Sequence, residues 1–326
     1  MLSATCPGAG TGADDEEALH APAFDTTGTS GAPLTGVISS SGRAALALER
    51  VGGRWDAFYR ANGNRFFKDR HFLVREFPEL AAAATVPTRL LEFGCGVGNA
   101  LLPLVAALPA LTVTAFDVSR TAITLAAAAL PPADAPRVAL FTANAVAGPP
   151  GHIVAAAAAA HAAATAAHAA ATASSPSTTP GAAAAAAAAA APRLEDGFHL
   201  VLLYFMVSAL PHECHQAVFD EAARCLCPGG RLLFRDYADA DAAEVRFAPR
   251  ARVAPRLYER GDGTLAAFLS PADVRRAAAH AGLAVVRIEV VERDITNHAE
   301  GATFHRRWLQ AVLEAPPLFP PRRPLP

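Results

Sequence analysis

The chain has almost no lysine: Lys68 is the single lysine among 28 basic residues, and the others are arginine. Alanine is in excess as well, so we attribute the skew to the base composition of the genome and not to the fold. The formal net charge of −2 excludes a whole-molecule positive field that would draw the chain onto nucleic acid. Any contact with RNA must therefore come from a local patch.

The five cysteines lack the spacing of a metal site. One residue separates Cys225 from Cys227, where a C-x-x-C knuckle needs two, and no second pair stands elsewhere. Cys6, Cys95 and Cys214 stand alone. We therefore expect reduced thiols, with no disulfide and no bound metal.

Long apolar runs and a basic leader are also missing. Only the alanine tract reaches the roughly 18 residues of a membrane helix, and histidines, a threonine and Pro180 interrupt it. No arginine precedes Arg43, while residues 14–17 are acidic, which is the reverse of a transit peptide. We predict a disordered tail over 1–45, no membrane association, and a location in the cytoplasm or the nucleus.

A glycine-rich turn follows an apolar run. Residues 90–98 read Leu-Leu-Glu-Phe-Gly-Cys-Gly-Val-Gly, and Asp117 ends the next apolar run. The arrangement predicts a strand, a turn and a helix start beneath a nucleotide-like cofactor, with Asp117 on its ribose hydroxyls. Dinucleotide folds use G-x-G-x-x-G, whereas this pattern is E-x-G-x-G-x-G. It resembles the first motif of class I S-adenosylmethionine methyltransferases, where glycines let the backbone pass close under the cofactor. An ordinary strand–helix turn is the alternative.

Strands alternate with helices along most of the chain. We predict strands at 89–93, 111–117, 138–142, 199–205, 231–236, 284–291 and 303–312, and helices at 98–108, 119–130, 212–226 and 271–281. Such alternation implies a mostly parallel sheet with helices on both faces. The last two strands have no helix between them and should form an antiparallel hairpin at the edge. The predicted fold class is α/β, a Rossmann-like seven-stranded sheet of the class I methyltransferase kind.

The composition divides the chain into six segments. They are a tail (1–45), a helical segment (46–84), two halves of an α/β domain (85–145 and 194–314), an alanine-rich insertion (146–193) and a proline-rich tail (315–326). Only resemblance to known methyltransferases implies that the helical segment is a lid that contacts RNA and that the two halves form a methyltransferase domain. We expect the insertion to lie outside the α/β pattern, because alanine offers little apolar area to bury. Its histidines, at 152, 161 and 168, have no acidic or cysteine partner, so we favour compositional chance over metal binding.

Two further blocks narrow the resemblance to a family. Residues 66–71 read Phe-Phe-Lys-Asp-Arg-His, and residues 234–237 read Phe-Arg-Asp-Tyr. Together with Trp-Asp-Ala-Phe-Tyr at 55–59 and Arg-Gly-Asp-Gly-Thr at 260–264, they resemble the methyltransferase-like family that makes 3-methylcytidine in the anticodon loop of tRNA. The resemblance implies a transferase with S-adenosylmethionine as cofactor and tRNA as partner. Some members of that family work with an aminoacyl-tRNA synthetase, notably the seryl enzyme.

Ten cofactor-binding residues follow from the resemblance. They are Trp55, Tyr59, Glu92, Gly94, Gly96, Gly98, Asp117, Asn144, Ala145 and Tyr204. The first two would close over the cofactor. Asn144, Ala145 and Tyr204 stand where the family usually has Asp, Leu and Ile, and Asn144 would bind the adenine amine without a charge.

Methylation of cytosine N3 needs no strong base, because N3 carries a free lone pair at neutral pH. The enzyme must flip the base out and align N3 with the methyl group. Asp236, at the end of the predicted fifth strand, is our candidate for stabilising the cationic product ring, with Arg235 or Tyr237 holding the base or its phosphate. The alternative for Asp236 is a capping role with no part in the transfer.

Cations and rings for RNA stand in two places. The predicted substrate-binding residues are Arg65, Phe66, Phe67, Lys68, Asp69, Arg70, His71, Arg246 and Arg260. An amphipathic helix with buried Phe66 and Phe67 is the alternative for the first group. Two other functions stay open: the same fold acting on a protein or small molecule, and a degenerate domain that binds tRNA or a synthetase as an adaptor.

Overall fold

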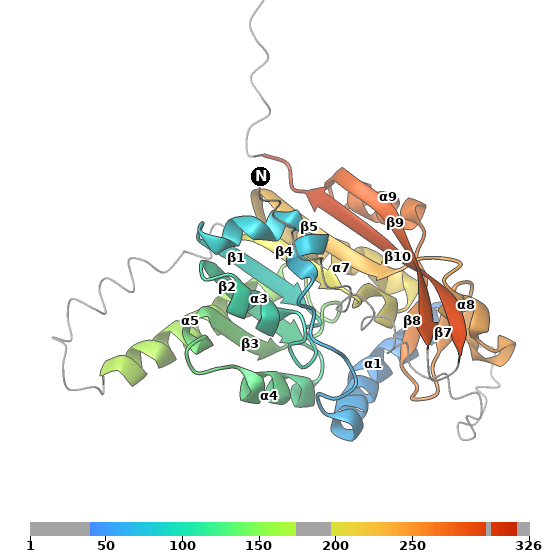
Figure 1. Cartoon of the computed structure of the whole chain (residues 1–326), viewed down its shortest axis with the longest axis horizontal. Helices are drawn as coiled ribbons and strands as arrows, with labels where there is room; N and C mark the ends of the chain where they lie inside the picture. Colours follow the sequence, from blue (N-terminus) through green and yellow to red (C-terminus); the bar gives the residue numbers. More distant parts are fainter. Residues whose placement is uncertain (1–39, 174–196, 298–300, 318–326) are drawn as a thin grey trace, which may run out of the picture.

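A seven-stranded sheet lies at the centre of the protein, with helices on both faces (Figure 1). The computed structural model describes residues 40–173, 197–297 and 301–317. The strand order is β3-β2-β1-β4-β5-β10-β9. The strands are β1 (Thr88–Phe93), β2 (Leu111–Asp117), β3 (Val138–Thr142), β4 (Phe198–Tyr204), β5 (Leu226–Tyr237), β9 (Ala284–Asn297) and β10 (Ala302–Glu314). Strands β1 to β5 pair in parallel, so the predicted fold class is confirmed.

Successive residues of β1 face opposite layers of helices, because side chains alternate along a strand. Leu90 packs with α2 (Leu73–Glu76), η1 (Pro78–Ala84) and α3 (Leu101–Ala107). Leu91 packs with α5 (His152–Ala173), α7 (His212–Cys225) and α9 (Pro271–His280). Both leucines are fully buried, which explains why the strand reads as a continuous apolar run.

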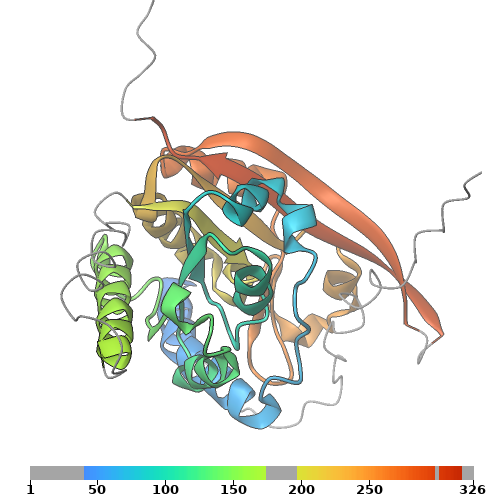
Figure 2. The ribbon, with the colours of Figure 1, turned by 60° about the vertical axis from the view of Figure 1, so that its left-hand side comes forward.

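The two C-terminal strands form the predicted antiparallel hairpin, and β10 lies between β5 and β9. Residues 308–314 of β10 pair with β5, while 302–307 pair with β9 alone. This end of the hairpin runs past β5 toward a second, three-stranded sheet (Figures 1 and 2). That sheet, β6 (Arg252–Ala254), β7 (Leu257–Glu259) and β8 (Leu265–Ala267), lies between the predicted strand 231–236 and the predicted helix 271–281, where the sequence pattern predicts no strand.

The alanine-rich segment differs from its predicted place outside the α/β pattern. Residues 152–173 form α5, which lies beside the sheet between β3 and β4 in the chain (Figure 2). Ile153 and Ala157 are buried in the same core cluster as Phe116 of β2 and Val218 of α7. The first turns of α5 therefore serve as the helix that a parallel crossover requires. Residues 174–193 lie outside the described residues.

The N-terminal segment is helical, as its pattern predicts. Helix α1 (Ser40–Asn62) packs on α4 (Arg120–Ala129) through Phe58, Tyr59 and Ala122. It begins within the stretch predicted as tail, whose residues 1–39 lie outside the described residues, as do 318–326 of the proline-rich tail. Across the three described ranges, no helix combines the length and the apolar character that a bilayer crossing demands.

Candidate active site

The glycine turn lets two side chains approach the backbone closely. Gly94 and Gly96 have φ angles of +67° and +54°, which side chains other than glycine rarely adopt. A Cβ on Gly94 would lie 2.6 Å from Cγ of Met206, and one on Gly96 would lie 2.5 Å from the hydroxyl of Tyr59. Both positions therefore require glycine.

A cavity opens above this turn, at the carboxyl ends of β1, β2 and β4. The space between its walls, with the solvent at its open mouth included, is about 920 Å³. It lies where the strand order reverses between β1 and β4, the usual ligand position in open α/β sheets. We call it the first cavity. Nine of the ten predicted cofactor-binding residues line it: Trp55, Tyr59, Glu92, Gly94, Gly96, Asp117, Asn144, Ala145 and Tyr204.

The tenth residue, Gly98, lies outside this lining and starts a helical turn. Its amide donates to the carbonyl of Cys95 (3.0 Å), and its own carbonyl accepts from Leu102 (2.9 Å). Gly98 therefore shapes the turn and does not face the cavity.

Two buried carboxyl groups face the first cavity. Asp117 accepts hydrogen bonds from the amides of Gly96 (2.9 Å) and Ser119 (2.8 Å). Burial nevertheless raises the pKa of Asp117 to about 6. Burial, with the nearby Asp117 charge, raises the pKa of Glu92 to about 8. Oε2 of Glu92 is buried and has no hydrogen-bond partner among the described residues, so this cavity has an acceptor for a cationic or hydrogen-bond-donating ligand.

A second cavity adjoins the first one. Rings and guanidinium groups dominate its lining, which comprises Trp55, Phe58, Phe66, Phe67, Arg70, Phe205, Ser208, Ala209, Tyr237, Arg260, Asp262, Thr264, Arg306 and Trp308. Both cavities share Trp55, Phe67, Arg70, Phe205 and Ala209, so the cavities adjoin and these residues form a wall common to both. Two ligands bound in these cavities would therefore lie next to each other.

Asn99, just after the glycine turn, holds part of this common wall. Its side-chain amide donates to the carbonyl of Phe67 (3.1 Å) and to Oδ1 of Asp69 (3.0 Å). Its carbonyl accepts from the amide of Arg70 (2.7 Å). The segment that carries Phe67 and Arg70 is thus fixed to the turn below the first cavity.

Comparison with known proteins identifies this arrangement. A family model described as a methyltransferase domain matches residues 64–288. The tRNA N(3)-methylcytidine methyltransferase Mettl2 of Drosophila melanogaster is 32% identical over 269 residues, covering 80% of this chain and 70% of that protein. The chain belongs to the tRNA N3-methylcytidine methyltransferase family. The enzyme trm141 of Schizosaccharomyces pombe is 29% identical, covering 79% of this chain and 90% of that protein. METTL6 of Homo sapiens is also 29% identical, with coverages of 82% and 81%.

The fold of this methyltransferase agrees with a solved structure. A SAM-dependent methyltransferase from Anabaena variabilis superposes with a TM-score of 0.52 at 11% identity, covering 81% of this chain and 95% of that one. S-adenosylmethionine is the cofactor of this methyltransferase. The first cavity fits it, because Glu92 has an acceptor oxygen for a cationic group.

The predicted catalytic residues of the methyltransferase occupy three different environments. Tyr237 lines the second cavity, whereas Asp236 and Arg235 line neither cavity. Arg235 is fully buried, bonds Glu76 and Gln310, and lies over the ring of Trp308. The prediction that Arg235 holds the base is therefore wrong in this structure, because a carboxylate and an amide already bind the guanidinium away from the site.

Asp236 lies directly below the loop that lines both cavities. It is fully buried and accepts hydrogen bonds from the amides of Ser208 (2.8 Å) and Tyr237 (2.9 Å). Burial raises its pKa to about 6. The structure places Asp236 as an anchor for the segment after β4, where Phe205 adopts a φ of +52°. It has no direct access to a ligand in either cavity.

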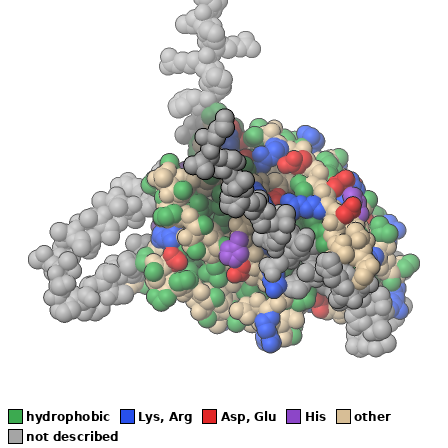
Figure 3. Space-filling view, in the orientation of Figure 1, with side chains coloured by type: hydrophobic (Ala, Val, Ile, Leu, Met, Phe, Trp, Pro, Cys, Tyr) green, Lys and Arg blue, Asp and Glu red, His purple; other side chains and the backbone are tan. Residues whose placement is uncertain are grey.

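Only part of the predicted substrate-binding set lines a cavity: Phe66, Phe67, Arg70 and Arg260. The side chains of Arg65, Lys68, Asp69 and His71 are exposed beside it. Arg246, in α8 (Ala242–Arg246), is exposed and lies over the ring of Phe304 (4.4 Å). On the face drawn in Figure 3, basic and acidic side chains are interspersed.

Several residues of the second cavity escaped the sequence interpretation, chiefly Arg306, Trp308, Asp262 and Thr264. Arg306 and Trp308 stand two residues apart on β10, so they share a face of the strand. That spacing was a usable signal. The spacing is easily overlooked, because Arg307 stands between the two residues and makes Arg306 look like part of a pair of adjacent arginines.

Proposed function

We propose that this methyltransferase transfers a methyl group from S-adenosylmethionine to N3 of cytidine in the anticodon loop of tRNA. One observation carries the proposal: a cavity lined by rings and guanidinium groups opens against the wall of the first cavity. Unstacked bases are recognised by stacking on such rings and by hydrogen bonds to their edges. The names of the relatives, all tRNA N3-cytidine enzymes, support the same substrate.

In this proposal the cofactor lies in the first cavity. Asp117 binds the ribose hydroxyls, Asn144 and Ala145 contact the adenine, and Trp55 and Tyr59 close over it. Glu92 faces the positively charged end of the cofactor. The glycines at 94 and 96 let the backbone pass beneath it. The site thus draws on both halves of the methyltransferase domain, 85–145 and 194–314, and on the lid.

The flipped base lies in the second cavity in this proposal. The cofactor supplies an electrophilic methyl carbon, to which the N3 lone pair bonds as the carbon–sulfur bond breaks and its electrons stay on sulfur. The positive charge moves to the ring, so the protein need not remove a proton. Phe66, Phe67 and Tyr237 stack on the base and exclude water, while Arg65 and Lys68 contact the neighbouring phosphates.

The segment after β4 argues against a different nucleic-acid chemistry. Enzymes that methylate exocyclic amines of bases often carry Asn/Asp-Pro-Pro-aromatic there, and this chain has Tyr-Phe-Met-Val at 204–207. We therefore place the chemistry at a ring nitrogen. A protein or small-molecule acceptor, or an adaptor role without catalysis, would be the reading if tRNA is not methylated.

The test is an incubation of the full chain with labelled S-adenosylmethionine and total tRNA, followed by digestion and measurement of 3-methylcytidine. We expect 3-methylcytidine from the wild type and none from Asp117→Ala, which removes the proposed ribose contact. A parallel reaction contains seryl-tRNA synthetase, the partner proposed by family resemblance. Cofactor binding without product in both reactions would favour another acceptor, and absence of cofactor binding would favour the adaptor. The proposed location is the cytoplasm or the nucleus, where tRNA is modified.

A further inference from the structure

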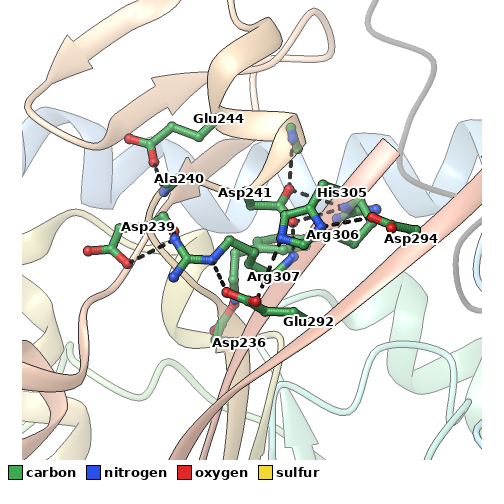
Figure 4. Close-up of polar contacts among 12 residues, drawn as sticks. Asp236, Asp239, Ala240, Asp241, Glu244, Glu292, Asp294, His305, Arg306 and Arg307 are labelled. Carbon is green, nitrogen blue, oxygen red and sulfur yellow. Dashed lines mark hydrogen bonds and ion pairs between the residues drawn. The ribbon is translucent and has the colours of Figure 1, made fainter. Parts of the chain in front are cut away.

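A buried ion pair lies beside the second cavity, between β10 and the loop before α8 (Figure 4). Nε of Arg306 donates to both carboxylate oxygens of Asp241, at 3.1 and 3.0 Å. The Arg306 side chain is 6% exposed and that of Asp241 is 0% exposed. Such burial is unusual for either residue type and requires compensating contacts.

Asp241 is fully engaged in this arrangement. Besides Arg306, it accepts from the amides of Ala243 (2.7 Å) and Arg307 (2.6 Å). It thereby caps the start of α8 and fixes the backbone of β10 at the position of Arg306. The carboxylate determines where the guanidinium points.

Arg306, in contrast, uses only one of its three nitrogen atoms. Among the described residues, neither Nη atom has a hydrogen-bond or ion-pair partner. The guanidinium lines the second cavity, 5.9 Å from the ring centre of Tyr237 and 5.4 Å from that of Trp308. Neither Nη atom is among the fully buried side-chain atoms that lack a partner, so their N–H groups reach the second cavity, where a ligand can accept from them. The cavity is therefore built for an occupant with an acceptor oxygen.

Charge distinguishes the two oxygen acceptors that RNA offers. A phosphate binds where positive charge is in excess. Arg70 and Arg260 add positive charge elsewhere in the lining, but Asp241 offsets the charge of Arg306 itself at contact distance. The pair presents polarised N–H donors with little net charge. A carbonyl oxygen of a base accepts a hydrogen bond from such a donor. The cytosine ring becomes cationic during the reaction, and a guanidinium whose charge is offset by a carboxylate does not repel it.

We propose that the Asp241–Arg306 pair donates hydrogen bonds to the O2 carbonyl oxygen of the acceptor cytosine, with Asp241 as the positioning residue. The inference rests on the proposed function, since it assigns the cytosine to the second cavity. Donation to O2 fixes the rotation of the ring in its plane. N3, the neighbouring atom on the same edge, then faces the first cavity and the cofactor in it.

The test pairs protein variants with a change in the substrate. Methyl transfer is measured on tRNA with cytidine, or with 2-thiocytidine, at the acceptor position, because sulfur is a weaker acceptor than oxygen. Wild type, Arg306→Gln, Asp241→Asn and Arg307→Gln are compared. Arg307 is the matched control, since its side chain bonds Glu292 and the carbonyl of Asp239 and lines neither cavity. Titration calorimetry with S-adenosylmethionine reports whether each variant is folded.

We expect Arg306→Gln to lower kcat on cytidine roughly 10- to 100-fold, the usual effect of losing a charge-assisted hydrogen bond. On 2-thiocytidine the wild type should already be slow, and Arg306→Gln should lose only a few-fold more. Asp241→Asn should show the same non-additivity with a smaller loss. Cofactor affinity and the rates of Arg307→Gln should stay at wild-type values.

Equal losses on both substrates would overturn the proposal, because a merely structural role does not sense the O2 atom. So would a flatter salt dependence of tRNA binding in Arg306→Gln, which would indicate a phosphate contact. If Arg306→Gln does not fold, Arg306→Lys is compared on the same two substrates. Lysine keeps the positive charge opposite Asp241 but lacks the forked N–H donors of the guanidinium. If the wild type binds the cofactor but makes no 3-methylcytidine, the proposed function itself is refuted, and this inference is refuted with it.

Discussion

Some residues of this site cannot be replaced without a clash, because a neighbouring side chain already occupies the space that an added Cβ would need. Gly96 has the sharpest constraint, because a Cβ would lie 2.5 Å from the Tyr59 hydroxyl and its φ is +54°. Tyr59 is itself buried, so it cannot simply move away.

We predict that Gly96→Ala destabilises the protein by about 1–3 kcal/mol and lowers the affinity for S-adenosylmethionine more than tenfold. Adding Tyr59→Phe should recover part of the stability by removing the clashing oxygen, while the cost of the positive φ remains. Gly53→Ala is the control, since a Cβ there has no neighbour within 4 Å. Thermal melts and titration calorimetry measure both effects, and a Gly96→Ala variant as stable as Gly53→Ala would contradict the prediction.

Glu92 makes cofactor binding sensitive to pH. Its pKa is raised to about 8 without ligand, and a cationic ligand favours the charged form. Below about pH 8 binding must therefore release a proton, so affinity for S-adenosylmethionine should rise from about pH 6 to about pH 8 and then level off. Glu92→Gln should bind more weakly and without this slope. Equal slopes in the two proteins would exclude Glu92 as the titrating group.

The same raised pKa values affect the free energy of unfolding. A carboxyl whose pKa is higher in the folded state loses its stabilising contribution as the pH rises through that value. For Glu92 the window runs from the ordinary value of 4.5 to about 8. The ligand-free wild type should therefore lose stability relative to Glu92→Gln over that range, as measured by urea unfolding at several pH values.

At the scale of elements, the end of β5 holds the loop after β4 in place through a hydrogen bond. Asp236 bonds the amide of Ser208, and Phe205, three residues earlier in the same loop, lines both cavities. Asp236 therefore holds the loop in place. That role differs from the electrostatic stabilisation of a cationic product that the sequence predicted for its carboxylate.

We predict that Asp236→Ala destabilises the protein by about 2–3 kcal/mol and abolishes activity, because two buried amides lose their acceptor. Asp236→Asn has no charge and keeps one of the two acceptor oxygens, which can still bond the amide of Ser208, while the amide of Tyr237 loses its acceptor. We expect it to retain at least a tenth of the wild-type kcat. A loss in Asp236→Asn as complete as in Asp236→Ala, with normal cofactor binding, would instead support a role for the charge.

The elements differ in how far sequence could predict them. Strands β1 to β5 are apolar and bounded by turns, so their positions and the glycine turn were predictable from local pattern alone. Helix α5 was not assigned to the core, because Ile153 is one apolar residue among many alanines and its burial depends on Phe116 and Val218. The placement of Arg235, Asp236 and Arg306 depends on partners more than 25 residues away, such as Glu76, Ser208 and Asp241. Local pattern contains no information about such pairs.

At the scale of the whole molecule, the net charge of −2 means that tRNA must be held by a few local cations. Arg65 and Lys68 are exposed beside the second cavity and are the proposed phosphate contacts. Their contribution should appear in the salt dependence of binding, not in sequence preference.

We predict that Arg65→Gln and Lys68→Gln each weaken binding of all tRNAs alike and reduce the slope of log affinity against log salt by about 1. Arg276→Gln is the control, since this exposed arginine pairs with Asp273 of the same helix, α9, and lines neither cavity. Filter binding at several salt concentrations measures the slopes. Unchanged slopes would mean that other cations hold the tRNA.

Asn99 joins the turn beneath the first cavity to the segment that carries Phe67 and Arg70 in the wall of the second. A ligand that shifts or stiffens the turn therefore changes the free energy of filling the other cavity. Coupling of this kind is reciprocal: whatever factor the cofactor adds to tRNA affinity, tRNA adds to cofactor affinity. With the two substrates placed as proposed, we expect each to change the affinity for the other through the backbone and side chain of Asn99.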